Sequence, residues 1–275
     1  MLIHKKAYAK INLSLKIMDK LPNGYHNILT VMQRISLCDD IKININQSTG
    51  QNINITCNDK NVPADKTNTA YRAADLFLEY AKIPADIDIE ITKRIPSQAG
   101  LGGGSSDAAS VLLGLNEYFD FILPKKILKE IAKKIGADVP FFMKNANCAV
   151  CAGIGDIVTP VRAERESFHV LIVKPAYNIS TKQAFEDFDD FRETNQFRES
   201  DKFKNDFTAL AFSQNKDLKI MRDLILDSGA SESELSGSGS ALFGIFDDLS
   251  NADKCKAALN LREDIEFCDI FDFLC

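Results

Sequence analysis

The sequence predicts an α+β fold, and three observations support this prediction. The chain has 275 residues, about 1.8 domains at roughly 150 residues each, so one large domain or two modest ones fit. Hydrophobic residues make up 45% of the chain, which is enough for a real core. Segments with the two-residue period of strands are interleaved with segments of helical period, without strict strand–helix–strand order. This order favours α+β over a doubly wound parallel sheet.

The N-terminal third predicts strands. Residues 7–17 alternate between apolar and polar side chains, which is typical of a half-buried strand. The polar segment 19–24 predicts a turn, and an apolar run over 28–37 predicts a second strand. Two further strand-like segments follow at 41–46 and 52–56. We interpret the four segments as a β-meander.

The remaining elements follow from changes of period. Residues 68–80, 105–118 and 124–135 predict helices, the last with Pro124 in its first turn and Gly136 at its end. Further strands are expected at 87–95, 146–152, 157–161, 168–173, 241–246 and 266–273, and further helices at 217–228 and 251–262. Residues 185–207 show little periodicity and predict an irregular surface segment. The polar stretch 160–167 predicts a boundary between domains 1–162 and 163–275.

Composition limits the classes of function. The formal net charge is −6 with a pI near 5.2, which argues against a nucleic-acid-coating protein and favours small-molecule chemistry. An anionic substrate would need a local positive patch. No signal peptide or membrane span is visible, so we expect a cytoplasmic protein with no membrane partner. Cys148 and Cys151 have metal-like spacing, but no second pair follows. We interpret them as reduced cysteines in a buried strand.

A glycine- and serine-rich loop before a helix is the most informative motif. It contains Pro96, Ser97, Gln98, Ala99, Gly100, Leu101, Gly102, Gly103, Gly104, Ser105 and Ser106. Glycines allow close backbone approach to a ligand, and the helix that follows offers free N–H groups and a positive dipole end. These features predict a phosphate-binding loop, although the pattern is neither a Walker A nor a dinucleotide-binding motif. The bland alternative is a flexible loop with a helix cap.

Four other features are candidates for the same site, each with an ordinary alternative. The turn 236–240, with Gly237 and Ser238, runs into an apolar strand, so a turn facing a ligand is favoured over a linker. Lys10 and Asn12 lie on the polar face of the first strand, where a lysine is usually solvated. Asp138 has an apolar flank typical of a partly buried carboxylate, or else it is an ordinary turn residue.

The fourth feature is a turn that presents Tyr25 and His26. An aromatic side chain beside a donor–acceptor edge suits a flat heteroaromatic ring. The alternative is an exposed turn with a surface histidine, and the local sequence does not choose between them.

In combination, these motifs resemble one family. Residues 7–13, 24–26, 96–108, 136–140 and 235–240 occur in the same order as in the galactokinase–homoserine kinase–mevalonate kinase–phosphomevalonate kinase superfamily. The match is strongest to its branch that phosphorylates a cytidine-diphosphate derivative of methyl-erythritol. The resemblance implies a two-lobed fold, with an N-terminal lobe like ribosomal protein S5 domain 2 and a ferredoxin-like C-terminal lobe.

The resemblance also implies an activity. The expected reaction transfers the γ-phosphoryl group of ATP, with Mg²⁺, to the 2-hydroxyl of that substrate, in the non-mevalonate route to isoprenoid precursors. The expected roles are as follows: Lys10 and Asp138 catalytic; residues 96–106 and Asn68 ATP-binding; and Asn12, Tyr25, His26, Phe185, Gly237 and Ser238 substrate-binding. Phe185 is expected to stack on the cytosine. No residues are assigned to the metal, although Ser105 or Ser106 could touch it. We expect a monomer, with a weak homodimer as the alternative.

Two departures and three rival functions accompany this resemblance. Asp156 stands where the family commonly has Glu, and residues 205–208 read Asn-Asp-Phe-Thr instead of Asn-Asp-Leu-Glu. The rivals are a mevalonate- or homoserine-type kinase, a catalytically inactive nucleotide-binding regulator, and an NAD-binding oxidoreductase. The oxidoreductase fails on the glycine pattern. The presence of both Lys10 and Asp138 argues against the inactive regulator, and Tyr25 with His26 argues against the other kinases.

Overall fold

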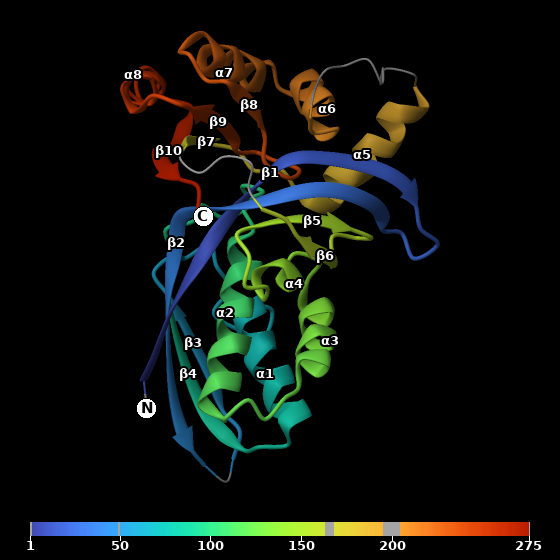
Figure 1. Cartoon of the computed structure of the whole chain (residues 1–275), viewed down its shortest axis with the longest axis vertical. Helices are drawn as coiled ribbons and strands as arrows, with labels where there is room; N and C mark the ends of the chain where they lie inside the picture. Colours follow the sequence, from blue (N-terminus) through green and yellow to red (C-terminus); the bar gives the residue numbers. More distant parts are fainter. Residues whose placement is uncertain (1, 49, 163–167, 195–203, 275) are drawn as a thin grey trace.

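Two antiparallel-rich sheets with helices against them confirm the α+β prediction (Figure 1). The computed structural model describes residues 2–48, 50–162, 168–194 and 204–274. The larger sheet has the order β3-β4-β2-β5-β6, with β1 paired to β2, and the smaller has the order β10-β7-β9-β8. The strands of the larger sheet are β1 Leu2–Lys20, β2 His26–Gln47, β3 Ile53–Cys57, β4 Ala85–Thr92, β5 Cys148–Ala152 and β6 Ile157–Pro160. Those of the smaller are β7 His169–Pro175, β8 Glu232–Leu235, β9 Leu242–Phe246 and β10 Ile265–Asp272.

The strands β1 and β2 form one long hairpin that extends past the rest of the larger sheet (Figure 1). The prediction of two separate strands at 28–37 and 41–46 was wrong, because both belong to the single strand β2, which continues through the polar pair Asp39-Asp40. Asp39 does not interrupt the strand, since its carboxylate is fully buried and accepts backbone N–H groups of Arg94 and Ile95. The predicted β-meander was also wrong: β3 pairs in parallel with β4, and β4 pairs with β2.

Three helices lie on one face of the larger sheet and confirm the helical periods of this half: two pack against its strands, and the third packs against these two helices (Figure 1). They are α1 Thr69–Ala81, α2 Gly103–Tyr118 and α3 Lys125–Ile135. In α1, Ala70, Ala73, Ala74 and Phe77 are buried, as their spacing predicts. A further short helix, α4 Val139–Phe142, was not predicted, because a single turn shows no period. Its side chains complete the core beneath α2.

The helices of the second half are α5 Thr181–Glu193, α6 Phe207–Gln214, α7 Lys216–Asp227 and α8 Leu249–Leu259. The irregular segment predicted at 185–207 was wrong over 185–193, which belongs to α5; residues 195–203 lie outside the described residues. Only Ala184 and Phe188 are buried in α5, so its apolar stripe is too narrow to give a clear period. The short strand β8 was also missed.

The smaller sheet is buried on both faces. Alternate residues of β7 point to opposite sides: Leu171 and Val173 join the core under the helices, whereas Val170 and Ile172 pack toward the hairpin. The hairpin contributes Ala9, Ile11, Leu15, Ile17 and Ile28 to these two cores. The boundary between 1–162 and 163–275 stays a prediction, since residues 163–167 lie outside the described residues.

Two expectations about composition can be compared with the structure. Cys148 and Cys151 are buried in β5 without a disulfide, as interpreted.

Within the described residues, no group of three or more His, Cys, Asp and Glu side chains is placed to hold a metal ion. Nor does any helix in that part of the chain combine the length and apolarity needed to cross a membrane.

Candidate active site

Lys10 is a buried polar residue of the hairpin, held by several hydrogen bonds. Its side chain is only 4% exposed, and its Nζ donates to Asn12 Oδ1 and to the carbonyl of Gly100, both at 2.7 Å. Its backbone N–H donates to the carbonyl of Leu101 at 3.0 Å. The β1–β2 register shifts on both sides of Lys10 and Asn12, so both side chains turn inward from a strand face that is usually solvated. Lys10 is therefore a buried ammonium fixed to the predicted phosphate loop.

Asp138 lies opposite this ammonium. It precedes α4, and its Oδ2 is 3.6 Å from Lys10 Nζ. The carboxylate side chain is 29% exposed, so it borders both the buried lysine and solvent. A Cβ added to Gly155 would lie 3.7 Å from Asp138 Oδ1, in ordinary contact, so Gly155 lies directly beside the carboxylate. The structure thus brings together the two predicted catalytic residues, which are 128 positions apart.

The predicted phosphate loop runs from Pro96 to the start of α2, with no side chain capping that helix. Gly102 has φ +73°, and a Cβ there would meet Phe142 and Lys10. Gly104 is exposed, Ser105 is half-buried and Ser106 is buried. A Cβ added to Gly136, before Asp138, would lie 3.7 Å from Ser105 Oγ. The free N–H groups of the first turn therefore open beside Lys10 and Asp138, as an anion site requires.

The turn 236–240 closes over the phosphate loop. Ser236 Oγ donates to the Gly100 carbonyl at 3.0 Å, and Asn205 Nδ2 donates to the carbonyls of Leu235 and Gly237, both at 2.8 Å. Gly237 lies against Gly100 and the Asn12 amide. Ser238, in contrast, is buried with its hydroxyl 3.1 Å from Thr181 Oγ1 at the start of α5. Of the two predicted substrate-binding residues in this turn, Gly237 borders the Lys10 site and Ser238 faces the helix.

Asn68 lies at the start of α1, next to the phosphate loop. Its Oδ1 accepts the Ala70 N–H at 2.8 Å, and its Nδ2 donates to the Pro63 carbonyl at 2.7 Å. Both ends of the amide are thus used inside the protein, and the residue acts as a helix cap. The neighbouring Thr69 Oγ1 donates to the Gly104 carbonyl, which ties α1 to the loop. A direct contact of Asn68 with ATP stays a prediction.

The tip of the hairpin carries the predicted nucleobase site. Tyr25 is 58% exposed, whereas His26 is 5% exposed and its ring stacks on Phe185 of α5, with centroids 5.0 Å apart and planes 14° apart. His26 Nε2 also bonds to Asp189 Oδ1 at 2.7 Å. No base fits between two rings in direct stacking contact. The structure therefore brings His26 and Phe185 together and leaves Tyr25 as the open aromatic face.

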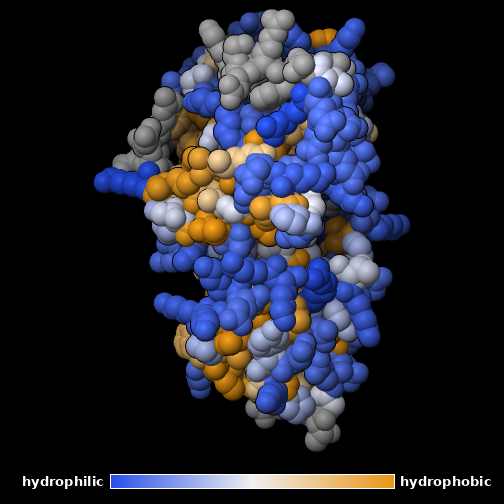
Figure 2. All heavy atoms as spheres, turned by 90° about the vertical axis from the view of Figure 1, so that its right-hand side faces the viewer, coloured by the Kyte–Doolittle hydropathy of each residue, from blue (hydrophilic) through white to orange (hydrophobic). Residues whose placement is uncertain are grey.

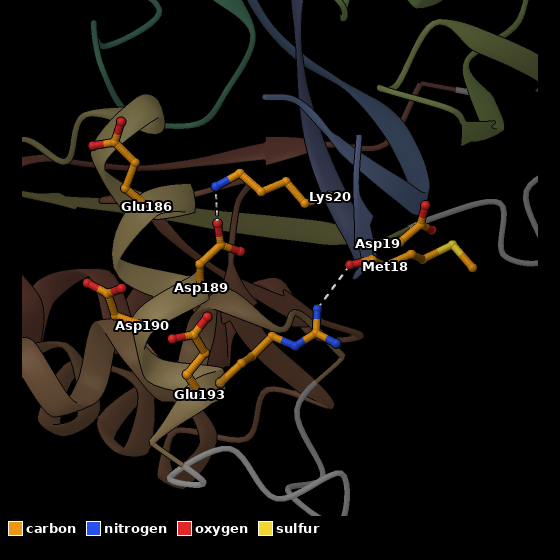
Figure 3. A pocket seen from close by; sticks show the side chains of 8 residues that line it. Met18, Asp19, Lys20, Glu186, Asp189, Asp190 and Glu193 are labelled. Carbon is orange, nitrogen blue, oxygen red and sulfur yellow. Dashed lines mark hydrogen bonds and ion pairs between the residues drawn. The ribbon is translucent and has the colours of Figure 1, made fainter. Parts of the chain in front are cut away.

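An open cavity of about 580 Å³ lies beside this tip (Figure 3). It is lined by Met18, Asp19, Lys20, Glu186, Asp189, Asp190, Arg192 and Glu193. Carboxylates outnumber cations in this lining, so it is a poor site for phosphate groups. Lys20 points across to Asp189 and bonds to it at 2.7 Å (Figure 3). A second cavity of about 340 Å³ lies where the phosphate loop begins, beside Pro96, Lys93 and Asp59.

The comparisons with known proteins can now be set against this geometry. Residues 68–145 match the family described as GHMP kinases N terminal domain, and residues 181–263 match GHMP kinases C terminal. The chain is 36% identical over 266 residues to 4-diphosphocytidyl-2-C-methyl-D-erythritol kinase of Clostridium novyi (strain NT), covering 91% of this chain and 93% of the relative. It is 39% identical over 265 residues to the protein of the same name in Geobacter sp. (strain M21), covering 92% of each.

The chain belongs to the 4-diphosphocytidyl-2-C-methyl-D-erythritol kinase family. It is thus an ATP-dependent phosphotransferase that acts on an alcohol group. A crystal structure of 4-(cytidine 5'-diphospho)-2C-methyl-D-erythritol kinase covers 98% of this chain and 99% of its own, with a TM-score of 0.78 and 29% identity. L. major mevalonate kinase matches at a TM-score of 0.70 and 14% identity, covering 98% and 95%, and supports the fold alone. The expected two-lobed kinase fold is confirmed.

The two departures from this kinase family's usual sequence have local partners. The carboxylate of Asp156 pairs with Lys133 of α3. The hydroxyl of Thr208 donates to Glu234 Oε2 of β8 at 2.9 Å, so a carboxylate stands beside position 208 although residue 208 is not acidic.

Several residues that shape the site were missed at the level of sequence. Arg34 pairs with Lys10 in the strand ladder, and its guanidinium donates to the carbonyls of Phe141, Phe142 and Lys144, which fixes α4 after Asp138. Asp189 was missed because no local motif marks it. Three further residues beneath the phosphate loop, Asp39, Lys93 and Asp107, form a buried ionic cluster. Only their burial and mutual contacts identify these residues, and neither is visible in a single sequence.

Proposed function

We propose that this kinase transfers the γ-phosphoryl group of ATP to the 2-hydroxyl of 4-diphosphocytidyl-2-C-methyl-D-erythritol, in the non-mevalonate route to isoprenoid precursors. The observation that carries the proposal is the Lys10–Asp138 pair at 3.6 Å beside the open N-terminus of α2. The relatives that share 36–39% identity over about 90% of the chain bear this substrate in their names.

The catalytic step follows from the positions of these two side chains. Asp138, partly exposed, accepts the proton of the attacking hydroxyl. Two of the three donors of the Lys10 ammonium are held by Asn12 and Gly100, so the third is left to face Asp138 and the transferring group. Phosphoryl transfer depends on positioning and charge stabilisation more than on covalent chemistry, and a fixed, buried ammonium supplies both.

ATP is proposed to bind along the phosphate loop. Its phosphate groups would accept N–H groups of the first turn of α2, with Ser105 and Ser106 as additional donors. The cavity beside Pro96 is proposed for the nucleoside end, since it adjoins the beginning of the loop. Local positive potential from Lys10 and the helix dipole allows a polyanion to bind despite the net charge of −6.

Mg²⁺ is proposed to arrive with ATP. The described residues contain no cluster of three metal-ligating side chains, so a metal would depend mainly on the phosphate oxygens. Magnesium keeps several waters and few protein ligands, so the half-buried Ser105 hydroxyl beside the loop fits this mode of binding. When bound, Mg²⁺ would neutralise charge on the β- and γ-phosphates.

The cytidine end of the acceptor is proposed to contact Tyr25 and His26. The acid-rich cavity beside them can accept the exocyclic amine of a cytosine but opposes phosphate groups, so the base is favoured over the diphosphate at this end. Asn12 and Gly237 would then border the methyl-erythritol near Lys10. Phe185 would have to leave its stack with His26 to cover a base placed between them.

A direct assay tests the proposal. The protein is incubated with Mg²⁺, ATP and 4-diphosphocytidyl-2-C-methyl-D-erythritol, and ADP release is followed by a coupled reaction, with ³¹P NMR on the product. We expect one ADP per acceptor and a new phosphomonoester at the 2-position. Turnover of mevalonate or homoserine instead would favour the other kinases. ATP binding without turnover of any of the three alcohols would favour an inactive regulator.

A further inference from the structure

A buried ionic cluster lies beneath the phosphate loop and takes no direct part in the proposed phosphoryl transfer, although its lysine also borders the cavity proposed for the nucleoside end of ATP. It consists of Lys93, which follows β4, Asp39 of β2 and Asp107 of α2. Their side chains are 6%, 0% and 4% exposed. Lys93 Nζ donates to Asp39 Oδ2 and, at 2.9 Å, to Asp107 Oδ2. The cluster therefore joins three elements through one ammonium.

The cluster holds both ends of the phosphate loop. At the beginning of the loop, Asp39 Oδ1 accepts the N–H groups of Arg94 at 2.6 Å and Ile95 at 2.9 Å. At its end, Asp107 belongs to the second turn of α2, directly after the two serines. Lys93 also lies against the first residue of this helix, since a Cβ added to Gly103 would be 3.1 Å from Nζ.

Stability alone is a weak explanation for such a cluster. Taking three charges out of water costs more than packing apolar side chains of similar size, so buried ion pairs are poor stabilisers. The arrangement is not even balanced: two carboxylates share one ammonium, and Asp107 Oδ1 is buried without a partner among the described residues. Burial accordingly raises the pKa of Asp107 to about 7. Because burying these three charged groups is unfavourable, the cluster is better explained by the geometry that it imposes on the phosphate loop.

We propose that Lys93 is a positioning residue for ATP. By bridging Asp39 to Asp107, it sets the distance between the beginning of the phosphate loop and the N-terminus of α2. The N–H groups of the helix then point at the phosphates in a fixed geometry. The inference rests on the proposed role of residues 96–106 in binding ATP, but not on the identity of the acceptor alcohol.

The first test is Lys93→Met, with Lys42→Met as its matched control. Lys42 makes an exposed pair with Glu90 across the same two strands, outside the site. The dissociation constant of Mg·ATP is measured by calorimetry without acceptor, and KM for each substrate is measured in the assay. We expect Lys93→Met to weaken ATP binding on the order of 10²-fold, about the loss of one or two hydrogen bonds to a charged group. KM for the acceptor and all constants of Lys42→Met should stay at wild-type values.

A second pair of variants keeps the test decisive where Lys93→Met fails to fold. Asp107→Asn retains an oxygen acceptor for Lys93, whereas Asp107→Leu does not. We expect the asparagine variant to bind ATP like the wild type and the leucine variant to lose affinity as Lys93→Met does. The proposal is overturned by wild-type ATP affinity in Lys93→Met or Asp107→Leu, or by equal losses for ATP and acceptor. If the proposed acceptor is wrong, the unmodified protein will instead bind ATP but will not turn over the acceptor.

Discussion

At the scale of single residues, Lys10 shows how a strand can hold a charged side chain buried from solvent. An alternating strand normally turns its lysines to solvent, yet two register shifts and the Gly100 carbonyl keep this one buried. The same carbonyl also accepts the Ser236 hydroxyl, so one oxygen connects the lysine to the second glycine turn. Lys10 is consequently held from both halves of the protein.

Removing either member of the Lys10–Asp138 pair should abolish most turnover without unfolding the protein. We expect Lys10→Met and Asp138→Asn each to lower kcat by at least about 10²-fold, the scale of a charge stabiliser or a general base. Lys6→Met, an exposed lysine on the same strand, is the control. Steady-state kinetics with circular dichroism measures both quantities, and near-wild-type kcat in the folded variants would contradict these roles.

The unusual acid beneath the loop predicts a pH-dependent stability. Burial raises the pKa of Asp107 from 3.8 to about 7, so the folded state binds this proton more tightly than the unfolded state. The protonated group therefore stabilises the fold below about pH 4, and this contribution is lost as the pH rises through about 7. Asp107→Asn cannot ionise. We expect the variant to gain in Tm relative to the wild type between pH 4 and 8, as measured by calorimetry; a constant difference would contradict this.

The sequence predicted which residues lie together where each of them belongs to a short local motif. It did not identify residues whose only signal is a contact with a partner far away in the chain. The glycine loop, Lys10 and Asp138 were singled out from short patterns, and the structure places them together. Asp189 and Lys93 carry no such pattern. Asp189 meets His26 from 163 positions away, and Lys93 meets Asp39 from 54, so only the folded chain shows these contacts.

At the scale of elements, the long and strongly periodic segments were predicted correctly. Helices α1, α2 and α3 lie within two residues of their expected bounds, because wide apolar faces define them. Helix α5 was missed, since its buried face consists of two side chains among exposed charges. Which strands pair with one another could not be predicted from the sequence either. The parallel pairing of β3 with β4 depends on the connection between them through α1, not on the sequences of the two strands.

The contact between the two glycine turns predicts an element-level effect. Gly100 has φ +74°, and a Cβ at this position would lie 1.9 Å from the Ser236 carbonyl oxygen. Gly100→Ala must therefore separate the turns, and the left-handed backbone adds about 1–2 kcal/mol of strain. We expect loss of ATP turnover together with a lower Tm. Gly50→Ala, which has neither a positive φ nor a close contact, should leave both unchanged; wild-type turnover in Gly100→Ala would contradict the packing described here.

At the scale of the whole molecule, the hairpin joins what the sequence suggested were two domains. Figure 2 shows a largely hydrophilic face on which apolar side chains are exposed at mid-height and again lower down. Met18 and Leu29 of the hairpin and Ile157 of β6 are exposed large apolar residues. Inside, Leu15 and Ile17 of β1 pack in the core of the smaller sheet. Further hairpin residues pack with Val170 and Phe243 in a core shared by both sheets.

This shared core predicts cooperative unfolding. A protein of two independent domains would unfold in two steps, but removal of either half here exposes a continuous apolar face. We expect one calorimetric transition for the full chain. We also expect a fragment of residues 1–162 to be unfolded or aggregated, as judged by circular dichroism and size-exclusion chromatography. Two resolved transitions, or a compact and soluble fragment, would contradict this. The same chromatography of the full chain tests the expected monomer.

The path of the hairpin also decides which parts of related kinases can be exchanged. A chimera joined near residue 162 would pair a foreign smaller sheet with hairpin side chains that pack against the sheet of this chain. The unit that is compatible with recombination is discontinuous: Leu15, Ile17 and Ile28 of the hairpin lie in the core of the smaller sheet, so the hairpin tip has to be exchanged together with that sheet and its helices. Acceptor specificity, insofar as it depends on the hairpin tip and α5, would then be transplanted as a single module built from two stretches of gene.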